Sequence, residues 1–432
     1  MAAGLGTRMK SAKPKHLHPL LGRRLADWAI EAVRPLGVDP LVVVASPEAA
    51  DAFDGVTVAV QKHPLGTGDA VRSAKPFLGD ADSVLIVSAD HPLLTPDVLR
   101  QLVGQHRHSG TSATVLSFEP PDPRAYGRIV RTGDGSLEAI VEARDATDEQ
   151  LRIGEVNSSI YVFDAVRLWP ALDRLQPQNA QGELYLTDAA RFLVEDGENV
   201  GVMKAPDPAE IEGVNTREEL ADAGASLRAR INREHMLAGV TIVDPDTTWI
   251  DAEVELEPDL TIHPFTVLRG RTRVAKGAEV GPHAVVLDAE IGEGVRVGPF
   301  CYLRPGTKLR VGSKAGAFVE IKNSEVGPRT KVPHLSYIGD AEIGEDTNIG
   351  AGTITANYPH QPGRPKGRTK IGSNVRTGIH NGFEAPVEIG DDAWIAGGSY
   401  ITDDVPPESL AGFPPRQITK EGYLRRKRDD NN

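Results

Sequence analysis

At 432 residues the chain is too long for one ordinary hydrophobic core, so two or three domains are expected. Its single cysteine, Cys301, excludes an intramolecular disulfide framework and a cysteine-based zinc site. The net charge of -13 argues against general nucleic-acid binding, which needs a basic surface, although a few lysines and arginines can still hold a phosphorylated substrate. No apolar run reaches the roughly 18 residues of a membrane span and no signal-peptide pattern is seen, so we expect a cytoplasmic protein that does not enter membranes.

A glycine-rich turn opens the chain, in MAAGLGTRM. Gly4 and Gly6 let backbone amides turn toward an anion, and Arg8 and Lys15 add positive charge. The pattern is neither GxGxxG nor a P-loop, which excludes the dinucleotide and Walker-type readings. By itself the turn is consistent with a phosphate site and no more.

The first half, over 1–215, alternates strand-like apolar runs with helical patterns. The runs are PLVVVAS (40–46), SVLIVSAD (83–90) and SSIYVFD (158–164). Continuous Val, Ile and Leu runs are typical of strands buried on both faces, as in a parallel α/β sheet. A charged segment over 216–237 then predicts a connecting helix, since Thr216 and Glu219 fit a capping box.

The period changes completely in the second half, where apolar residues recur every six positions. A hexapeptide repeat predicts a parallel β-helix, in which short strands stack inward-pointing aliphatic side chains into a column. We expect it over 238–420, with a flexible tail over 421–432. The repeat positions are Ile250, Leu256, Ile262, Leu268, Val274, Val280, Val286, Ile291, Val297, Leu303, Leu309, Ala315, Ile321, Val326, Val332, Ile338, Ile343, Ile349, Thr355, Ile371, Thr377, Phe383, Ile389, Ile395 and Ile401.

Ordered motifs in both halves resemble one known family. The first half carries VQKHPLGTGDA (60–70), SADHPLL (88–94), YGRIV (126–130), VEARDATDEQ (141–150), GEVNSSIYVF (154–163) and EIEGVN (210–215). The second carries YLRPGTKL (302–309), AFVEIKNS (317–324), VPHLSYIGDAEIG (332–344) and NIGAGTITANY (348–358). Over essentially its whole length the chain resembles the bifunctional N-acetylglucosamine-1-phosphate uridyltransferase/glucosamine-1-phosphate N-acetyltransferases. The resemblance implies a Rossmann-like nucleotidyltransferase domain followed by a left-handed β-helix, and the synthesis of UDP-N-acetylglucosamine.

For the first half the resemblance implies a magnesium-dependent uridylyl-transfer site. Mg²⁺ prefers oxygen ligands and keeps several waters, so one carboxylate and one amide oxygen suffice. Asp90 also ends a buried strand, where ligands bind in open α/β sheets. The implied roles are the UTP triphosphate for Gly4, Arg8 and Lys15, the uracil for Gln61, Gly66 and Thr67, the amino sugar phosphate for Gly127, Glu142 and Asn157, and Mg²⁺ for Asp90 and Asn215.

For the second half the resemblance implies acetyl transfer from acetyl-CoA. An amine attacking a thioester must lose a proton, and a histidine suits that task near neutral pH. The implied roles are the base for His334 with Glu320 orienting it, glucosamine-1-phosphate for Arg304, Lys322, Tyr337 and Asn348, and acetyl-CoA for Asn357, Tyr358, Lys366 and Arg416. The resemblance also implies a homotrimer.

The chain departs from the family's pattern at four places: Ser88-Ala89 for Tyr-Gly, Asn157-Ser158-Ser159 for Asn-Thr-Gly, Gly378-Ile379 for Gly-Ser, and Pro414 for an arginine that contacts CoA. The last two keep open an alternative, a nucleotidyltransferase whose acetyltransferase half is inactive or altered. A non-enzymatic assembly subunit of the same architecture is a third hypothesis, and the retention of Arg8, Lys15, Asp90 and Asn215 argues against it. Relatives also carry an apolar strand ahead of the opening turn, so we expect that Met1 is not the natural start and that the neighbours of this strand are exposed.

Overall fold

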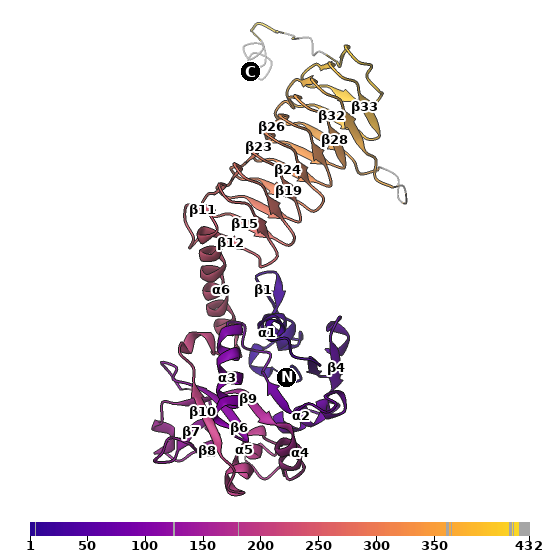
Figure 1. Ribbon diagram of the computed structural model, residues 1–432. Coiled ribbons are helices and arrows are strands. Elements are labelled where there is room, and N and C mark those ends of the chain that lie inside the picture. The colour runs from indigo at the N-terminus through magenta and orange to yellow at the C-terminus, as the bar shows by residue number, and fades with distance from the viewer. Residues whose placement is uncertain are drawn as a thin grey trace, which may run out of the picture. The chain divides into compact units, whose positions relative to one another are not determined.

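The computed structural model describes residues 1–4, 6–123, 126–179, 181–359, 363, 365–413, 417 and 419–422. The chain forms two compact units, Met1–Leu227 and Arg228–Asn432, each of which is described by itself (Figure 1). Helix α6, Arg217–Leu237, contains the boundary between them. Its predicted capping box is confirmed, because Glu219 N–H donates to Thr216 Oγ1 at 3.1 Å and Thr216 N–H donates to Glu219 Oε2 at 3.0 Å. None of the helices in the described part of the chain is long and apolar enough to cross a membrane.

The N-terminal unit is an α/β structure built on a mixed sheet. The sheet has the order β10-β6-β9-β7-β8, with β5 pairing with β9, and β3 and β4 form a separate parallel pair. The strands are β3 (Val42–Ala45), β4 (Thr57–Val60), β5 (Ser83–Ile86), β6 (Ala113–Phe118), β7 (Arg128–Arg131), β8 (Leu137–Val141), β9 (Val156–Asp164) and β10 (Val200–Lys204), beside the hairpin of β1 (Pro19–Leu20) and β2 (Arg23–Arg24). The helices are α1 (Leu25–Val33), α2 (Thr67–Ala74), α3 (Pro96–Ser109), α4 (Ala165–Asp173) and α5 (Leu186–Glu195).

Three apolar runs were predicted as strands and are strands, but the predicted direction is wrong for one of them. β9 runs antiparallel to both β5 and β6. An apolar run indicates that a strand is buried on both faces. A strand buried on both faces needs apolar residues whether it runs parallel or antiparallel to its neighbours, so the run does not predict its direction.

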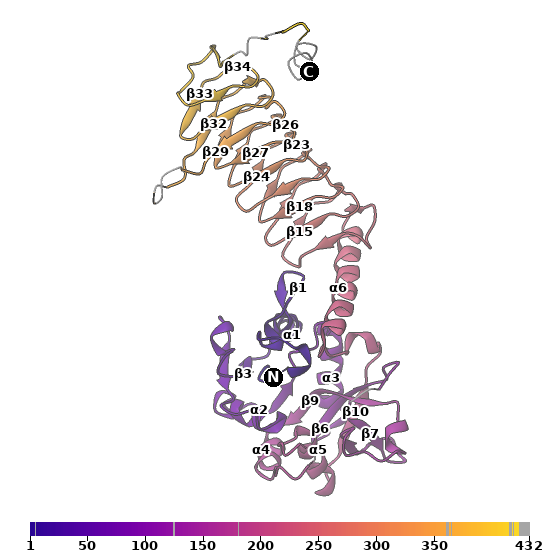
Figure 2. The ribbon, with the colours of Figure 1, turned by 180° about the vertical axis from the view of Figure 1, so that it is seen from behind.

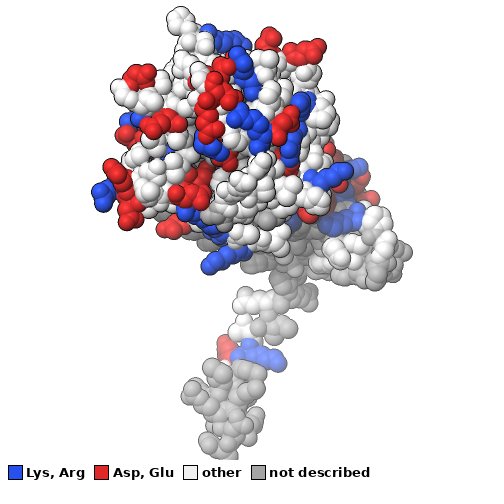
Figure 3. Space-filling view, turned by 90° about the horizontal axis from the view of Figure 1, so that it is seen from below, with Lys and Arg blue, Asp and Glu red and all other residues white. Residues whose placement is uncertain are grey.

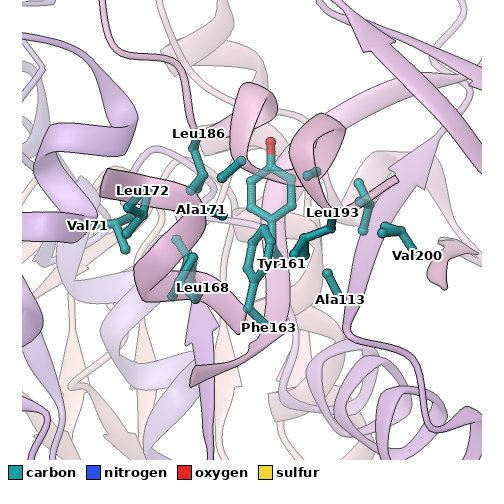
Figure 4. Packing of buried hydrophobic residues seen from close by; sticks show 14 of the residues in the cluster. Val71, Ala113, Tyr161, Phe163, Leu168, Ala171, Leu172, Leu186, Leu193 and Val200 are labelled. Carbon is teal, nitrogen blue, oxygen red and sulfur yellow. The ribbon is translucent and has the colours of Figure 1, made fainter. Parts of the chain in front are cut away.

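The core of this unit lies where β9 meets helices α4 and α5. Tyr161 and Phe163 of β9 are 1% and 0% exposed, and their rings lie 5.7 Å apart. Figure 4 shows Leu168 and Leu172 of α4 and Leu193 of α5 around these two rings. This packing fixes β9, and with it Asn157 and Ser159 near the start of the strand, which belong to the candidate site.

The opening residues lie between β3 and β5. Ala2 N–H donates to Val44 C=O at 2.6 Å, and the Met1 amino group donates to Val87 C=O at 2.7 Å. An apolar cavity of about 200 Å³ lies beside them. Val44 and Ile86 next to it are buried, whereas Leu41, Val42, Leu85 and Val87, which also line it, are half-buried, so the expected exposure of apolar neighbours is seen in part.

The C-terminal unit is the parallel β-helix that the repeat predicted, left-handed as the resemblance implied, and its stacked coils are seen in Figures 1 and 2. Its first sheet contains β11 (Thr241–Ile242), β14 (Thr261–Ile262), β17 (Glu279–Val280), β20 (Arg296–Val297), β23 (Lys314–Ala317) and β26 (Lys331–His334). Its second contains β12 (Trp249–Ile250), β15 (Val267–Arg269), β18 (Val285–Leu287), β21 (Tyr302–Leu303), β24 (Glu320–Lys322), β27 (Tyr337–Gly339), β29 (Ile354–Ala356), β32 (Gly382–Glu384) and β35 (Tyr400–Ile401). Its third contains β13 (Glu255–Leu256), β16 (Arg273–Val274), β19 (Glu290–Ile291), β22 (Lys308–Leu309), β25 (Glu325–Val326), β28 (Ala341–Ile343), β30 (Thr369–Ile371) and β33 (Val387–Ile389). Strands β31 (Arg376–Thr377), β34 (Trp394–Ile395) and β36 (Leu410–Ala411) pair in a further sheet.

The repeat positions form the core of this unit. All of them are buried except Leu256, which is half-buried. Leu256 lies in β13, the terminal strand of the third sheet, so a neighbouring coil covers it on one side only. The six-residue period therefore identified the inward-facing column correctly.

Candidate functional site

The glycine-rich turn of the N-terminal unit is shaped by Gly6. This residue has φ of 60° and precedes the short 3₁₀ helix Thr7–Met9. A Cβ atom at Gly6 would lie 2.5 Å from Lys15 Cβ. Only glycine allows this close approach, and the approach brings the Lys15 side chain under the turn.

Lys15 joins the turn to the two expected metal ligands. Its Nζ donates to Asp90 Oδ2 at 2.5 Å and to Asn215 Oδ1 at 3.1 Å. Arg8 also donates to Asn215 Oδ1, at 3.0 Å. The backbone brings the oxygens together, because Val214 N–H donates to Asp90 C=O at 2.8 Å. Residues more than 200 positions apart thus meet in one cluster.

The Asp90 carboxylate is ionised although it is buried. Burial raises the pKa of the Asp90 carboxyl, but the charge of Lys15, followed by those of His91 and His16, lowers it well below its usual range. Ser88 Oγ donates to Asp90 Oδ1 at 2.7 Å. The carboxylate is therefore charged at neutral pH and fixed at both oxygens.

The residues expected to read the base lie around the start of α2. Gln61 Nε2 donates to Gly66 C=O and to Asp69 Oδ2, each at 3.0 Å, which leaves Oε1 as its acceptor. Gly66 has φ of 114°, and a Cβ there would lie 2.6 Å from Leu184 C=O. Thr67 Oγ1 accepts from Leu186 N–H at 2.9 Å, so this hydroxyl ties α2 to α5.

One cavity of about 440 Å³ joins these groups. It is lined by all six residues predicted for UTP and by both residues predicted for the metal, namely Gly4, Arg8, Lys15, Gln61, Gly66, Thr67, Asp90 and Asn215. The structure brings this set together. Its sequence members are scattered over the first half of the chain, so chance proximity does not account for them.

The three residues predicted for the amino sugar form a second group beside this cavity. Asn157 N–H donates to Gly127 C=O at 2.8 Å, and a Cβ at Gly127 would lie 3.4 Å from the Glu142 carboxylate. Burial raises the pKa of Glu142. Ser159 lines the cavity and donates its N–H to Asn157 Oδ1 at 3.1 Å, which links the two groups.

Ser159 explains one departure from the family's pattern. Its φ is 62°, in the left-handed region, where the family has glycine and this chain has serine. A non-glycine residue pays roughly 1 kcal/mol for this conformation. The backbone shape of the sugar group is therefore kept in spite of the substitution.

The donor set around Asp90 fits Mg²⁺. A single cationic atom, Lys15 Nζ, already contacts both the carboxylate and the amide oxygen. No cluster of three or more His, Cys, Asp or Glu side chains able to hold a metal occurs among the described residues, so further ligands would be water or phosphate oxygens. Figure 3 shows acidic and basic side chains interspersed on the face of the N-terminal unit turned to the viewer. That face carries no broad basic field of the kind that binds nucleic acid.

In the β-helix three of the four residues predicted for glucosamine-1-phosphate, Arg304, Lys322 and Tyr337, stand on consecutive coils of the second sheet. Tyr337 stacks on Glu320 in the register of β24 and β27. Arg304 follows β21, and its Nη1 donates to Glu320 Oε1 at 2.8 Å. Lys366 lies close enough to Lys322 to lower the pKa of that lysine, and Arg304 acts in the same direction. Three cations therefore gather at one place, as an anion site requires.

The residues predicted for acetyl-CoA continue from this place. Asn357 Nδ2 donates to Tyr337 Oη at 3.4 Å, and Lys366 Nζ lies 5.8 Å from the centre of the Tyr358 ring. Tyr358 is 75% exposed. Pro414 and Arg416 lie outside the described residues, as does most of the predicted tail over 421–432. Ile379, the other departure, is exposed in a turn.

His334 ends β26 and is exposed. Its C=O accepts from Ser336 Oγ at 2.8 Å, which fixes the turn that leads to Tyr337. Asn348, one coil further along the chain, forms a parallel bridge with Lys331. Because Lys331 and His334 both belong to β26, Asn348 lies on the same sheet as His334. Glu320, the residue predicted to orient His334, accepts a hydrogen bond from Arg304.

Two contacts of the N-terminal site were missed from the sequence. In the sequence Ser88 is only a departure from the family's pattern, whereas in the structure its hydroxyl donates to Asp90. His91 Nδ1 lies 2.7 Å from Ile211 C=O and its Nε2 lies 3.5 Å from Asp90 Oδ1. The signal was present in SADHPL, where polar residues flank the aspartate on both sides at the end of a buried strand.

A nucleotidyltransferase unit with a carboxylate–lysine cluster, joined to a hexapeptide β-helix with a cationic site, defines a transferase that acts on phosphorylated substrates. A family model described as a MobA-like NTP transferase domain matches residues 1–189. The Bifunctional protein GlmU of Thermoanaerobacter pseudethanolicus is 42% identical over 98% of this chain and 96% of its own length. The Bifunctional protein GlmU of Streptomyces avermitilis is 46% identical over 99% of this chain and 94% of its own length, and that of Mycolicibacterium gilvum is 45% identical over 99% and 91%.

The chain therefore belongs to the family of bifunctional GlmU proteins. It is a bifunctional transferase of UDP-N-acetylglucosamine synthesis, with acetyl-CoA as acetyl donor and Mg²⁺ as the metal of uridylyl transfer. Neither the inactive-acetyltransferase alternative nor the assembly-subunit alternative is retained.

Proposed function

We propose that the cavity around Lys15 is the uridylyl-transfer site. The observation that carries this proposal is the convergence of Arg8, Lys15, Asp90 and Asn215 on one cavity. In this assignment Gly4, Arg8 and Lys15 hold the triphosphate of UTP, Gln61, Gly66 and Thr67 hold the uracil, Gly127, Glu142 and Asn157 hold N-acetylglucosamine-1-phosphate, and Asp90 and Asn215 bind Mg²⁺. Gln61 Oε1, left free as an acceptor, suits the N–H of uracil.

The chain's own groups act by neutralising and aligning two polyanions. A phosphate oxygen of the sugar attacks the α-phosphorus of UTP, and the bond to pyrophosphate breaks. The reaction needs no covalent intermediate, only reactants held in line with their repulsion offset. A bound Mg²⁺ supplies further charge neutralisation at the phosphate oxygens. Arg8 supplies positive charge from the glycine-rich turn, and Lys15 supplies positive charge from beside Asp90.

In the β-helix we assign His334 as the general base. It takes a proton from the amine of glucosamine-1-phosphate as the nitrogen attacks the thioester carbonyl, and CoA leaves as the thiolate. Glu320, held by Arg304, orients the imidazole. Arg304 and Lys322 hold the phosphate, Tyr337 and Asn348 the sugar, and Asn357, Tyr358, Lys366 and Arg416 the acetyl-CoA.

The quaternary and cellular assignments complete the proposal. We expect a homotrimer, because β-helices of this type present acyl-transfer sites between subunits, and a cytoplasmic location, where UTP and acetyl-CoA are made. The functional boundaries are 1–215 for uridylyl transfer, 216–237 for the linker, 238–420 for acetyl transfer and 421–432 for the tail.

The test is a substrate panel that assays both half-reactions separately. UTP with N-acetylglucosamine-1-phosphate and Mg²⁺ should release pyrophosphate, and acetyl-CoA with glucosamine-1-phosphate should release CoA thiol. Arg8→Gln should raise the KM for UTP about 10- to 100-fold, since one charged contact to phosphate is lost. Lys10→Gln, an exposed change in the same turn, is the matched control. Equal effects of the two changes would remove Arg8 from the site.

A further inference from the structure

A buried carboxylate to which neither half-reaction has so far assigned a role lies among the residues proposed for acetyl transfer. Asp340 follows β27 and is 9% exposed. Its N–H donates to Lys322 C=O at 3.0 Å, and its C=O accepts from Thr369 N–H at 3.1 Å. Its φ of 50° lies in the left-handed region, which aspartate tolerates better than most residues. Neighbouring strands thus hold the carboxylate in one place.

Asp340 accepts hydrogen bonds from the side-chain amides of two other coils. Asn323 Nδ2 donates to Oδ1 at 2.5 Å, and Asn357 Nδ2 donates to Oδ2. An ionised carboxylate can only accept, so the nitrogen of each amide must face it. This argument fixes the orientation of Asn357 without relying on how its amide atoms are assigned.

The orientation of Asn357 decides what it can offer a ligand. Its nitrogen carries two hydrogens, one donated to Asp340 and the other to Tyr337 Oη at 3.4 Å. The remaining polar atom is Oδ1, which only accepts. The pantetheine arm of acetyl-CoA carries amide N–H groups, which are the matching donors.

Asp340 is also close enough to Lys322, one of the cations predicted to hold phosphate, for its charge to act on the pKa of that lysine. Lys366 and Arg304 lower the pKa of Lys322, and the charge of Asp340 opposes them. Removing this charge would leave the phosphate site more positive.

We propose that Asp340 is a positioning residue for acetyl transfer, which fixes the Asn357 amide so that Oδ1 accepts an N–H of the pantetheine arm of acetyl-CoA. The inference rests on the proposed role of Asn357 in binding acetyl-CoA. Asp340 touches no reacting atom and acts through Asn357.

The first test is Asp340→Asn. An amide at this position can donate as well as accept, so the Asn357 amide is free to turn. The KM for acetyl-CoA should rise about 10- to 100-fold, the loss expected for a charged hydrogen bond. The KM for glucosamine-1-phosphate should stay level or fall, because a negative charge near Lys322 is removed. General damage to the coil would raise both constants, and an unchanged KM for acetyl-CoA would also overturn the proposal.

Asn323→Ala is the matched control, because it removes the other donor to the same carboxylate. It should leave the KM for acetyl-CoA within about 3-fold of wild type. A rise equal to that of Asp340→Asn would make the carboxylate merely structural and overturn the proposal.

The exchanged pair, Asp340→Asn with Asn357→Asp, keeps the test decisive even where the single variant does not fold. The introduced amide donates to the introduced carboxylate, whose second oxygen accepts the ligand N–H. We expect the KM for acetyl-CoA to return to within about 10-fold of wild type, whereas Asn357→Asp alone raises it further. No recovery in the folded pair overturns the proposal.

Asn357→Ala separates this inference from the assignment beneath it. If this change leaves the KM for acetyl-CoA unaltered, the role of Asn357 and the inference both fail. If it raises that KM while Asp340→Asn does not, the inference alone fails. Uridylyl transfer, measured on the same preparations, should be unchanged throughout.

Discussion

Replacing Lys15 by methionine should destabilise the N-terminal unit and stop uridylyl transfer while acetyl transfer continues. The side chains of Lys15 and Asp90 are 8% and 15% exposed, and their charged atoms lie 2.5 Å apart. Methionine has a similar length but no charge, so the Asp90 carboxylate stays buried without its cation. Removing one partner of a buried pair costs roughly 3–5 kcal/mol. Lys13→Met, an exposed change in the same loop, should stay within about 0.5 kcal/mol of wild type.

The pH dependence of this loss has a definite sign. In the wild type the lowered pKa of Asp90 contributes stability that is full above the ordinary aspartate value and is lost as the pH falls through the folded value. In Lys15→Met burial acts without the lysine and raises this pKa, so the deficit is largest near neutral pH and shrinks in acid. Asp90→Asn in the Lys15→Met background should recover most of the stability, since no charge remains to bury.

The assay is urea unfolding of the N-terminal unit at pH 7 and pH 5 for the wild type, both single variants and the double variant. A Lys15→Met protein no less stable than Lys13→Met would refute the reasoning. So would a double variant no more stable than Lys15→Met, because the loss would then not come from the Asp90 charge.

Three further outcomes follow from the same structure. Burial lowers the pKa of His16 to about 4, so the N-terminal unit should lose about 3 kcal/mol of stability as the pH falls from about 6.5 to about 4. His16→Gln should therefore reduce the change in melting temperature between pH 7 and pH 5. The same change in melting temperature in the wild type and the variant would contradict this. Ile338→Ala removes a fully buried side chain from the β-helix column and should cost about 2–5 kcal/mol in that unit, with uridylyl transfer intact as the control. Gly66→Ala would place a Cβ 2.6 Å from Leu184 C=O at a φ of 114°. It should raise the KM for UTP by about 10-fold or more without changing the KM for acetyl-CoA. In the control Gly79→Ala the new Cβ meets nothing nearby, so both constants should stay unaltered.

The β-helix could be predicted closely from the sequence because each sixth residue meets the same requirement. Ile262, Val280 and Val297 all point into one column, so the period reports the fold directly. In the N-terminal unit the apolar runs reported burial but not direction, and β9 was assigned wrongly for that reason. Local signals such as the capping box at Thr216 and Glu219 were reliable because their partners are three residues apart.

The site was predictable in its members but not in its contacts. Lys15, Asp90 and Asn215 could be named from motifs, yet nothing in their spacing indicates that one ammonium contacts both oxygens. The motif around Asp340 indicates roles for His334 and Tyr337, so the sequence alone does not single out Asp340. Its significance depends on amides 17 residues away on either side, which only the stacking of coils brings to it.

We propose that one chain holds two sites that work independently of each other, one around Asp90 and one around His334. The most direct measurement assays pyrophosphate release and CoA thiol release on the same preparations of Asp90→Ala and His334→Ala. We predict that Asp90→Ala loses uridylyl transfer by at least about 100-fold and keeps acetyl transfer, and that His334→Ala shows the reverse. A variant that keeps both activities, or an intact folded variant that loses both, would contradict the account.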